Sequence, residues 1–401
     1  MTLSLSPLRI AMPPALLASN IQAVVQRALD DRRLVGAVVL VARNGELIHR
    51  QAAGWADRES RRAMRVDALF RLSSVSKPII STAALVLVAQ GRLDLDAGID
   101  RWLPEFQPRL GDGRPARITA RQLLSHTAGL GYRFLEADAN GPYAVAGVSD
   151  GMDAADITLE ENLRRIASVP LLYAPGTAWG YSLATDVLGA LIARVYGAPL
   201  NDAVRALVTG PLGMADTDFA TSETQRVATA YVNAAPQPHR LAEAETVSAF
   251  EGAIGIRYSP ARIFDPQAFA SGGAGMVGTA EDFLRLLEAL RDGGGDGDGE
   301  LLPSQLIEEM ASDQTGGAAL QDLPGLGFGL GFSVLRDPTL AASPESVGTW
   351  RWGGAYGHSW FVDRALGLSV VAFTNTLYEG MSGSFVTDLR DAVYATVEAR
   401  Q

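Results

Sequence analysis

Residues 70–77 read FRLSSVSK, and they lead into the stretch STAALVLVAQG at residues 81–91. The second stretch is typical of a helix, and residues 70–77 are expected to form its start. Positions three apart lie on one face of a helix, so Ser74 and Lys77 should point the same way within hydrogen-bonding reach. Free backbone N–H groups and positive potential at the helix N-terminus would lie beside the Ser74 hydroxyl. The stretch can therefore hold a serine nucleophile, its base and a developing oxyanion in one place.

Lys77 is the only lysine among the 34 lysine and arginine residues of the chain. Arginine does not lose its proton near neutral pH, whereas a buried lysine can be neutral there and act as a base. A lysine kept at this one position suggests a task that arginine cannot perform. The alternative is that one codon escaped a strong compositional bias, and a Ser-x-x-Lys tetrad also occurs by chance at a capped, solvated helix start. Other motifs have to decide between these interpretations.

The composition excludes several classes of function. A net charge of −11 disfavours nucleic acids and anionic membranes as partners, because both are bound by clustered cations. Cysteine is absent, which excludes disulfides, thiolate metal sites and a cysteine nucleophile. The four histidines are scattered without the spacing of a zinc site, so neither a metal nor another cofactor is expected. The expected partner is a small molecule.

The sequence shows no pattern for export or for membrane insertion. Its first 20 residues, MTLSLSPLRIAMPPALLASN, lack both a basic segment ahead of an apolar run and a small-residue cleavage site. Apolar runs such as GAVVLVAR are far shorter than the roughly 20 residues of a membrane-spanning helix. We therefore expect a cytoplasmic protein that does not bind membranes.

Strand patterns occur at both ends of the chain. Near the N-terminus, a helical pattern at residues 16–34 precedes a hairpin pattern at residues 36–54, whose Asn44-Gly45 pair suits a type I′ turn. Near the C-terminus, a hairpin pattern at residues 359–376 precedes a helical pattern at residues 384–398. We expect the two ends to pair into one antiparallel sheet with the terminal helices packed on it.

The expected fold class is α/β (α+β), divided into two domains. Residues 1–76 and 325–401 would form a discontinuous α/β domain around the sheet, and residues 77–324 would form a helix-rich domain. The helical patterns of the second region lie at residues 81–91, 120–129, 159–169, 184–197 and 280–293. Ligand sites favour the clefts between domains, so we expect the active site there.

Four segments together resemble the serine β-lactamase-like superfamily, which includes class C β-lactamases and penicillin-binding proteins. They are FRLSSVSKP at residues 70–78, ITARQLLSHTAGL at residues 118–130, Tyr181-Ser182-Leu183, and Trp352-Gly353-Gly354 before AYGHSW. They occur in the order found in that superfamily, and the resemblance covers nearly the whole chain. More narrowly, the chain resembles family VIII carboxylesterases, the branch related to class C β-lactamases. The resemblance implies a β-lactamase-like fold, with residues 118–130 as a structural helix.

The resemblance also implies a role for each matching residue. Ser74 would be the acylated nucleophile, Lys77 its hydrogen-bonded base and Tyr181 the partner that shares and returns the proton. The backbone N–H groups of Ser74 and Ala355 would form the oxyanion hole. The substrate-binding residues would be Trp352, Gly353, Gly354 and Tyr132.

Two departures from the β-lactamase pattern favour esters as substrates. The family's Tyr-x-Asn becomes Tyr181-Ser182-Leu183, which loses the amide that would hold a β-lactam side chain. Its Lys-Thr-Gly becomes Trp352-Gly353-Gly354, which loses the cation that would receive a substrate carboxylate, and family VIII esterases are similar to this sequence there. We expect hydrolysis of short-chain or small neutral carboxylic esters, little or no β-lactamase activity, and removal of acetyl groups from cephalosporin esters.

Two other classes of function would use the same site. An acyltransferase would pass the acyl group to a bulky alcohol instead of water. A penicillin-binding-like protein would be acylated without turnover.

Two further motifs are set aside because of their context. Residues 147–151 match the G-x-S-x-G nucleophile elbow, with Ser149 as nucleophile and His358 as candidate base, but the flanking sequence reads as loop rather than strand and helix. Residues 273–278 match a dinucleotide-binding fingerprint, but no strand pattern precedes them and the following Thr279 reads as a helix cap.

Overall fold

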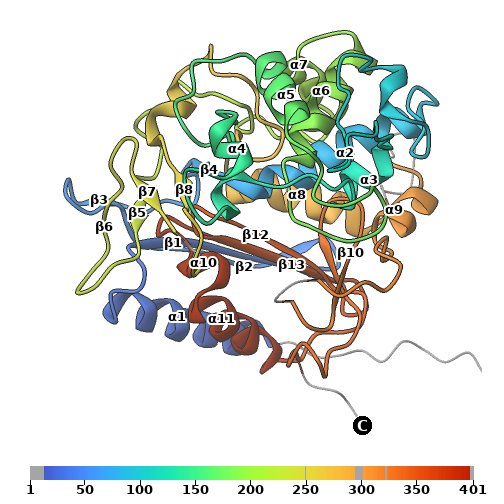
Figure 1. Ribbon diagram of the computed structural model, residues 1–401. Coiled ribbons are helices and arrows are strands. Elements are labelled where there is room, and N and C mark those ends of the chain that lie inside the picture. The colour runs from blue at the N-terminus through green and yellow to red at the C-terminus, as the bar shows by residue number, and fades with distance from the viewer. Residues whose placement is uncertain (1–12, 249, 294–300, 321–322, 398–401) are drawn as a thin grey trace, which may run out of the picture.

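The computed structural model describes residues 13–248, 250–293, 301–320 and 323–397. Its central element is an eight-stranded antiparallel sheet with the strand order β10-β11-β12-β13-β14-β1-β2-β3 (Figure 1). The N-terminal strand β1 (Gly36–Arg43) pairs with the C-terminal strand β14 (Leu368–Thr374) along its length. The two ends of the chain therefore form one sheet, which confirms the predicted fold class.

The other elements follow in three groups. The sheet is completed by β2 (Glu46–Asp57), β3 (Arg62–Ala63), β10 (Leu326–Phe328), β11 (Ser333–Leu335), β12 (Trp350–Gly354) and β13 (His358–Asp363). Short strand pairs are β4 (Phe70–Arg71) with β9 (Val277–Gly278), β5 (Tyr231–Val232) with β6 (His239–Arg240), and β7 (Thr246–Val247) with β8 (Ile256–Arg257). The helices and short helical turns are α1 (Pro14–Asp30), η1 (Ser73–Val75), α2 (Ser76–Ala89), η2 (Ile99–Arg101), α3 (Ala120–Leu124), η3 (Arg133–Leu135), α4 (Pro142–Val145), α5 (Leu159–Ser168), α6 (Ala184–Tyr196), α7 (Leu200–Val204), η4 (Arg205–Thr209), η5 (Pro260–Phe264), α8 (Ala280–Arg291), α9 (Ser304–Met310), α10 (Glu379–Ser382) and α11 (Ser384–Tyr394).

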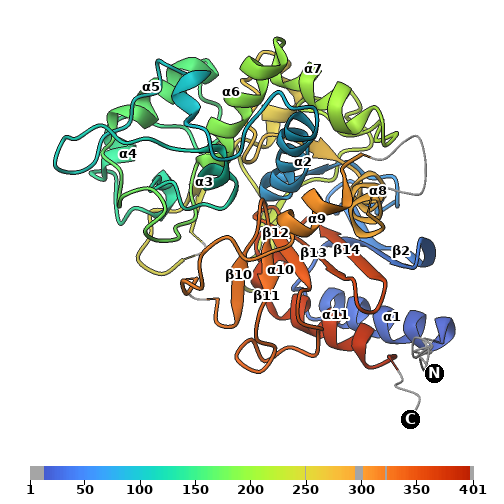
Figure 2. The ribbon, with the colours of Figure 1, turned by 90° about the vertical axis from the view of Figure 1, so that its right-hand side faces the viewer.

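Strand β1 is apolar on both faces because the sheet is covered on both sides. Successive side chains of a strand point to opposite faces. Val38 and Leu40 pack into the large core that also contains side chains of α2 and α8. Val39 and Val41 pack into a second core with the terminal helices α1 and α11, which lie side by side beneath the sheet (Figure 2). The continuous apolar run of β1 thus reflects its central position.

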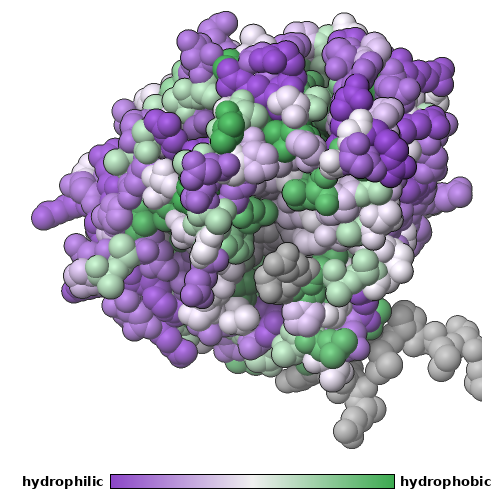
Figure 3. Space-filling view, in the orientation of Figure 1, coloured by the Kyte–Doolittle hydropathy of each residue, from purple (hydrophilic) through white to green (hydrophobic). Residues whose placement is uncertain are grey.

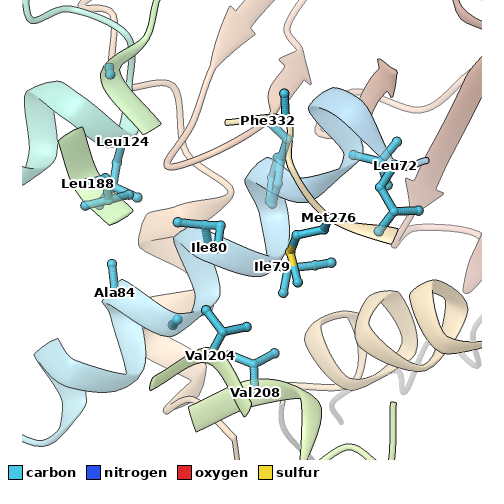
Figure 4. Close-up of a cluster of buried hydrophobic side chains, with 14 of the residues drawn as sticks. Leu72, Ile79, Ile80, Ala84, Leu124, Leu188, Val204, Val208, Met276 and Phe332 are labelled. Carbon is cyan, nitrogen blue, oxygen red and sulfur yellow. The ribbon is translucent and has the colours of Figure 1, made fainter. Parts of the chain in front are cut away.

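Helix α2 is buried along most of its length on the other side of the sheet. Ile79 and Ile80 are fully buried, and Figure 4 shows Ile79 beside Met276 and Ile80 on the side of the helix that faces Leu188 of α6. Val204 and Val208 of the α7–η4 segment pack against the same helix. Burying such a side chain contributes roughly 1.5 to 3 kcal/mol to the free energy of unfolding. This packing fixes the helix that begins at the predicted Ser-x-x-Lys tetrad.

The first hairpin matches its prediction closely, whereas the first helix is shorter than predicted. Asn44 and Gly45 have φ angles of 49° and 85°, which a type I′ turn requires at its two central positions. Helix α1 ends at Asp30 instead of residue 34, and Arg32 just beyond it has a φ of 58°. A left-handed residue cannot continue a right-handed helix.

The predicted helix at residues 118–130 is wrong over most of its length, because α3 covers only Ala120–Leu124. His126 has a φ of 56°, which lies outside the helical region. The chain turns at this point so that the carbonyl of His126 accepts the N–H of Gly180, one residue before Tyr181. A tertiary contact therefore overrides a local helical pattern.

The surface and the termini add little to the assignment of function. Figure 3 shows hydrophilic residues over much of one face and hydrophobic residues gathered around its central hollow. Within the described ranges, no helix is both long and apolar enough to cross a membrane. The first 12 residues, on which the predicted cytoplasmic location partly rests, lie outside the described residues.

Candidate active site

The serine and the lysine of the tetrad meet at the junction of η1 and α2. Ser74 lies in the short turn η1 and Lys77 is the second residue of α2. Lys77 is fully buried, and its Nζ donates to Ser74 Oγ over 3.2 Å. The half-buried Ser74 is the more accessible of the two. The spacing of three residues thus produces the contact that the sequence predicted.

Tyr181 joins this pair from a distant part of the chain. It lies three residues before α6, and its Oη is 2.6 Å from Ser74 Oγ. The Lys77 Nζ is 4.7 Å from the centre of the Tyr181 ring, a distance at which a cation is attracted to the ring face. The Ser74 oxygen therefore has an amine on one side and a phenol on the other.

The carbonyl of Gly273 is a further partner of Lys77 that the sequence did not reveal. Lys77 Nζ donates to Gly273 O over 2.8 Å. A Cβ at residue 273 would lie 2.5 Å from Oδ2 of Asp186, so a larger residue would have to displace this buried carboxylate. A carbonyl oxygen is present at every residue, so the sequence contains no signal for this role.

Buried acidic groups lie behind Lys77. Asp186 accepts a hydrogen bond of 2.6 Å from Ser271 Oγ, and burial raises the pKa of its carboxyl, while the Ser271 hydroxyl and the Lys77 charge oppose that rise. Tyr132 is 3% exposed, and burial raises its pKa well above the ordinary value, with the charges of Tyr181 and Asp186 adding to the rise. A neutral Tyr132 ring therefore lies 5.5 Å from Lys77 Nζ.

An aromatic wall stands beside the nucleophile. The Trp352 ring from β12 is 5.3 Å from the Tyr181 ring and 5.1 Å from the Phe328 ring. Trp179 extends the wall, since its ring lies 5.6 Å from that of Phe328. Trp352, Trp179 and Tyr181 are half-buried, so they keep surface that a bound molecule can cover. Such a wall favours apolar, uncharged groups.

The two glycines after Trp352 let β12 pack closely against its neighbours, Gly353 against α10 and Gly354 against the turn that carries Ser74. A Cβ at Gly353 would lie 2.8 Å from the Met381 side chain, and a Cβ at Gly354 would lie 2.6 Å from Leu72 O. Beyond Gly354, a turn closes where Gly357 N–H donates to Gly354 O over 2.8 Å. Within the described part of the chain, the Ala355 N–H in this turn has no protein acceptor. It can donate to a bound ligand.

His126 packs against the site as an uncharged ring. It is buried 5.0 Å from the Tyr181 ring, and its Nδ1 lies 3.2 Å from Ser182 Oγ. Burial lowers its pKa well below the ordinary value, and the charge of Lys77 lowers it further. Its environment therefore does not suit a group that must gain a proton.

The G-x-S-x-G segment is a buried structural loop. Ser149 is 1% exposed; its Oγ donates to the Asp153 carboxylate and its N–H donates to Asn162 Oδ1. His358 lies in the sheet, where its Nε2 donates to Arg71 O, and burial lowers its pKa to about 4. The segment runs between helices α4 and α5 with no strand in front of it. No nucleophile elbow is present here.

The described residues contain no group of three or more His, Asp or Glu side chains that could hold a metal ion. The polar groups around Ser74 are engaged with one another. The arrangement is suited to proton transfer and to attack by a hydroxyl.

Comparisons with known proteins identify the family of the chain. Residues 21–395 match the model of the Beta-lactamase family. The chain is 52% identical to Esterase EstB of Burkholderia gladioli over 393 residues, which covers 98% of this chain and 99% of EstB. The solved structure of "EstCE1, a hydrolase with promiscuous acyltransferase activity" superposes with a TM-score of 0.92 at 46% identity, covering 95% of this chain and 99% of EstCE1. Simvastatin synthase LovD from Aspergillus terreus has the same fold, with a TM-score of 0.73 at 22% identity and coverage of 96% and 99%.

Proposed function

This chain belongs to the Beta-lactamase family and is an ester hydrolase, and from that premise we propose that it cleaves small neutral carboxylic esters through an acyl-enzyme on Ser74. The observation that carries the proposal is the position of Ser74 Oγ, 3.2 Å from Lys77 Nζ and 2.6 Å from Tyr181 Oη. A serine hydroxyl becomes a nucleophile when an adjacent group takes its proton. Here two such groups flank one oxygen.

The proposed acylation begins when Ser74 Oγ attacks the ester carbonyl carbon. The hydroxyl proton passes to the pair formed by Lys77 and Tyr181, and the carbonyl oxygen becomes an oxyanion. The backbone N–H groups of Ser74 and Ala355 donate to that oxyanion, whose charge is absent from the bound ester and develops in the transition state. The tetrahedral intermediate collapses, the ester C–O bond breaks, and the leaving alcohol takes the proton from Tyr181.

The proposed deacylation repeats these steps with water. Water attacks the Ser74 ester and gives a proton to the same pair, and collapse of the second intermediate returns that proton to Ser74 Oγ and releases the carboxylic acid. Each step needs a group that accepts and then returns one proton, which an arginine at position 77 could not do.

The choice of neutral substrates follows from the aromatic wall. Trp352 occupies the position where a carboxylate-binding lysine is expected in β-lactamases, and its ring faces Tyr181 and Phe328. Gly353 and Gly354 allow β12 to pass close to the acyl group. Tyr132, which the sequence predicts to bind substrate, is 3% exposed, so we propose that it acts mainly through its contact with Lys77.

The proposal also covers the organisation of the chain. We propose that residues 1–76 and 325–401 form one domain and residues 77–324 the other, with Ser74 and Lys77 on either side of the boundary. The cytoplasmic location and the absence of nucleic-acid and membrane partners stay predictions from the sequence.

A series of chromogenic esters with increasing acyl length, assayed beside a chromogenic cephalosporin, tests the proposed substrate class. We expect turnover of short neutral acyl esters and far slower opening of the β-lactam ring. A cephalosporin with an acetoxy arm should lose acetate while its ring survives, which mass spectrometry of the products would show. Ring opening as fast as ester turnover would contradict the role given to Trp352.

Acyl transfer to an alcohol is the second candidate, because EstCE1 is described as having promiscuous acyltransferase activity. Adding a bulky alcohol to the ester assay separates the two reactions. A hydrolase should form mainly the free carboxylic acid, whereas an acyltransferase should form mainly the ester of the added alcohol. A burst of one equivalent of product without turnover would instead indicate an acyl-binding protein.

A further inference from the structure

Three serines of the turn at residues 73–76 have separate partners. Ser74 Oγ contacts Lys77 and Tyr181. Ser76 Oγ accepts the N–H of Met276 over 3.3 Å, next to β9. Ser73 Oγ accepts the N–H of Tyr356 over 3.3 Å, in the turn between β12 and β13. The nucleophile is thus flanked by two hydroxyls that attach its turn to other parts of the molecule.

Ser73 adopts a backbone conformation that disfavours any residue with a side chain. Its φ is 45°, in the left-handed region that glycine occupies without penalty. Ser73 is also 0% exposed, so its hydroxyl needs a partner inside the protein. A serine in a strained and buried position points to a task for its hydroxyl.

The end of strand β12 lies so close to Ser73 that Gly354 has no room for a side chain. A Cβ at Gly354 would lie 2.7 Å from Ser73 Oγ and 2.6 Å from Leu72 O. The turn that begins at Gly354 contains Ala355 and Tyr356 and closes at Gly357. The Ser73 hydroxyl therefore contacts this turn at the N–H of Tyr356, which is the residue after Ala355.

We infer that Ser73 is a positioning residue for the oxyanion hole. By binding the Tyr356 N–H, its hydroxyl fixes the turn so that the Ala355 N–H points at the same substrate oxygen as the Ser74 N–H. This inference rests on the proposed function. The two N–H donors come from segments 281 residues apart, and only contacts between those segments can set their separation. Ser73 makes such a contact, and it is the residue directly before the nucleophile Ser74.

The inferred role has a kinetic consequence. Donors of an oxyanion hole must lie about 2.7 to 3.1 Å from the oxyanion, and the loss of one donor lowers kcat by roughly 100- to 1,000-fold. A displaced donor should have a smaller effect of the same kind. Because the oxyanion is absent from the bound ester and develops only as the serine attacks, kcat should fall and KM should stay nearly constant.

The test compares Ser73→Ala, Ser73→Gly and Ser76→Ala in the full chain with a short-chain chromogenic ester. Both Ser73 variants should lose roughly 10-fold or more in kcat with KM changed by less than about threefold. Ser73→Gly should melt at a higher temperature than Ser73→Ala, because glycine relieves the strain. Ser76→Ala is the matched control, since it also removes a buried hydroxyl from a backbone N–H, and its kcat should stay within about threefold of the parent.

Several results would overturn the inference. One is a kcat of Ser73→Gly within about threefold of the parent value. Another is a fall in the kcat of Ser76→Ala as large as the fall in the Ser73 variants. A rise in KM at constant kcat would also contradict it. Ser74→Ala separates this inference from the proposed function: activity in Ser74→Ala defeats both, whereas an inactive Ser74→Ala beside a fully active Ser73→Gly defeats only the role of Ser73.

Discussion

The turn around Ser74 and the loop around Ser149 both carry a serine in a sequence motif of hydrolases, but they differ in what the hydroxyl contacts. Ser74 Oγ faces an amine and a phenol at a half-buried position. Ser149 Oγ donates to the Asp153 carboxylate and accepts the N–H of Gly151 in a fully packed interior. The comparison shows that the groups around a serine, rather than its motif, decide whether it can attack a substrate.

Removing each hydroxyl in turn gives the largest expected difference between the two regions. Ser74→Ala should abolish ester turnover, because Ser74 Oγ is the serine hydroxyl that Lys77 Nζ contacts among the described residues. Ser149→Ala should keep most of the turnover and lose about 1 to 2 kcal/mol of the free energy of unfolding, because it breaks buried hydrogen bonds. Initial rates with a chromogenic ester and denaturant unfolding measure both quantities. An active Ser74→Ala together with an inactive Ser149→Ala would reverse the assignment.

Lys77→Arg tests whether the cation at this site must give up its proton. Arginine keeps the charge but cannot accept a proton near neutral pH, so ester turnover should fall by roughly 100-fold or more. Steady-state kinetics on protein whose fold is verified by circular dichroism would measure this. If the folded variant retains most of its turnover, Lys77 acts only through its charge.

Trp352→Lys tests the apolar wall on the active side of the comparison. The substitution removes ring contacts with Tyr181 and Phe328, so kcat/KM for neutral esters should fall by about 10-fold. Binding of anionic substrates should improve by no more than about 1 to 2 kcal/mol, because a partly solvated ion pair contributes little. Parallel kinetics with a neutral ester and a carboxylate-bearing analogue measure both effects. Trp352→Phe is the matched control and should stay closer to the parent with the neutral ester.

Asp150, next to Ser149, should affect the stability of the protein and leave ester turnover nearly unchanged. Burial raises its pKa to about 8, although the Arg133 N–H opposes the rise. Between pH 4 and 8 the unfolded chain ionises this carboxyl while the folded chain keeps it protonated, so stability should fall as the pH rises. The slope from this group approaches about 1.4 kcal/mol per pH unit. Asp150→Asn should flatten the decline measured by urea unfolding at several pH values, and an unchanged slope would show that Asp150 is ionised in the folded protein.

The sequence predicted the parts of the structure that depend on local patterns. The Asn44-Gly45 turn, the apolar strand β1 and the contact between Ser74 and Lys77 all follow from short-range spacing. The break at His126 could not be predicted, because it depends on the contact with Gly180 that forms only in the folded chain.

The candidate site divides in the same way. Tyr181 was predicted only through a family resemblance, since 107 residues separate it from Ser74. The Gly273 carbonyl and the Ser73 hydroxyl left no trace in the sequence, because one is backbone and the other depends on a φ angle. Contacts between distant segments are the part of an active site that spacing alone does not reveal.

Covalent labelling with a phosphonate ester, followed by peptide mapping, tests the central claim most directly. Trypsin does not cut before Pro78, so Ser74 lies in the peptide of residues 72–92 and Ser149 lies in the peptide of residues 134–164. We expect one equivalent of label, with fragmentation placing it on Ser74 and no labelling in Ser74→Ala. Label on Ser149, on Ser73 or on Ser76 of the active protein would contradict the account.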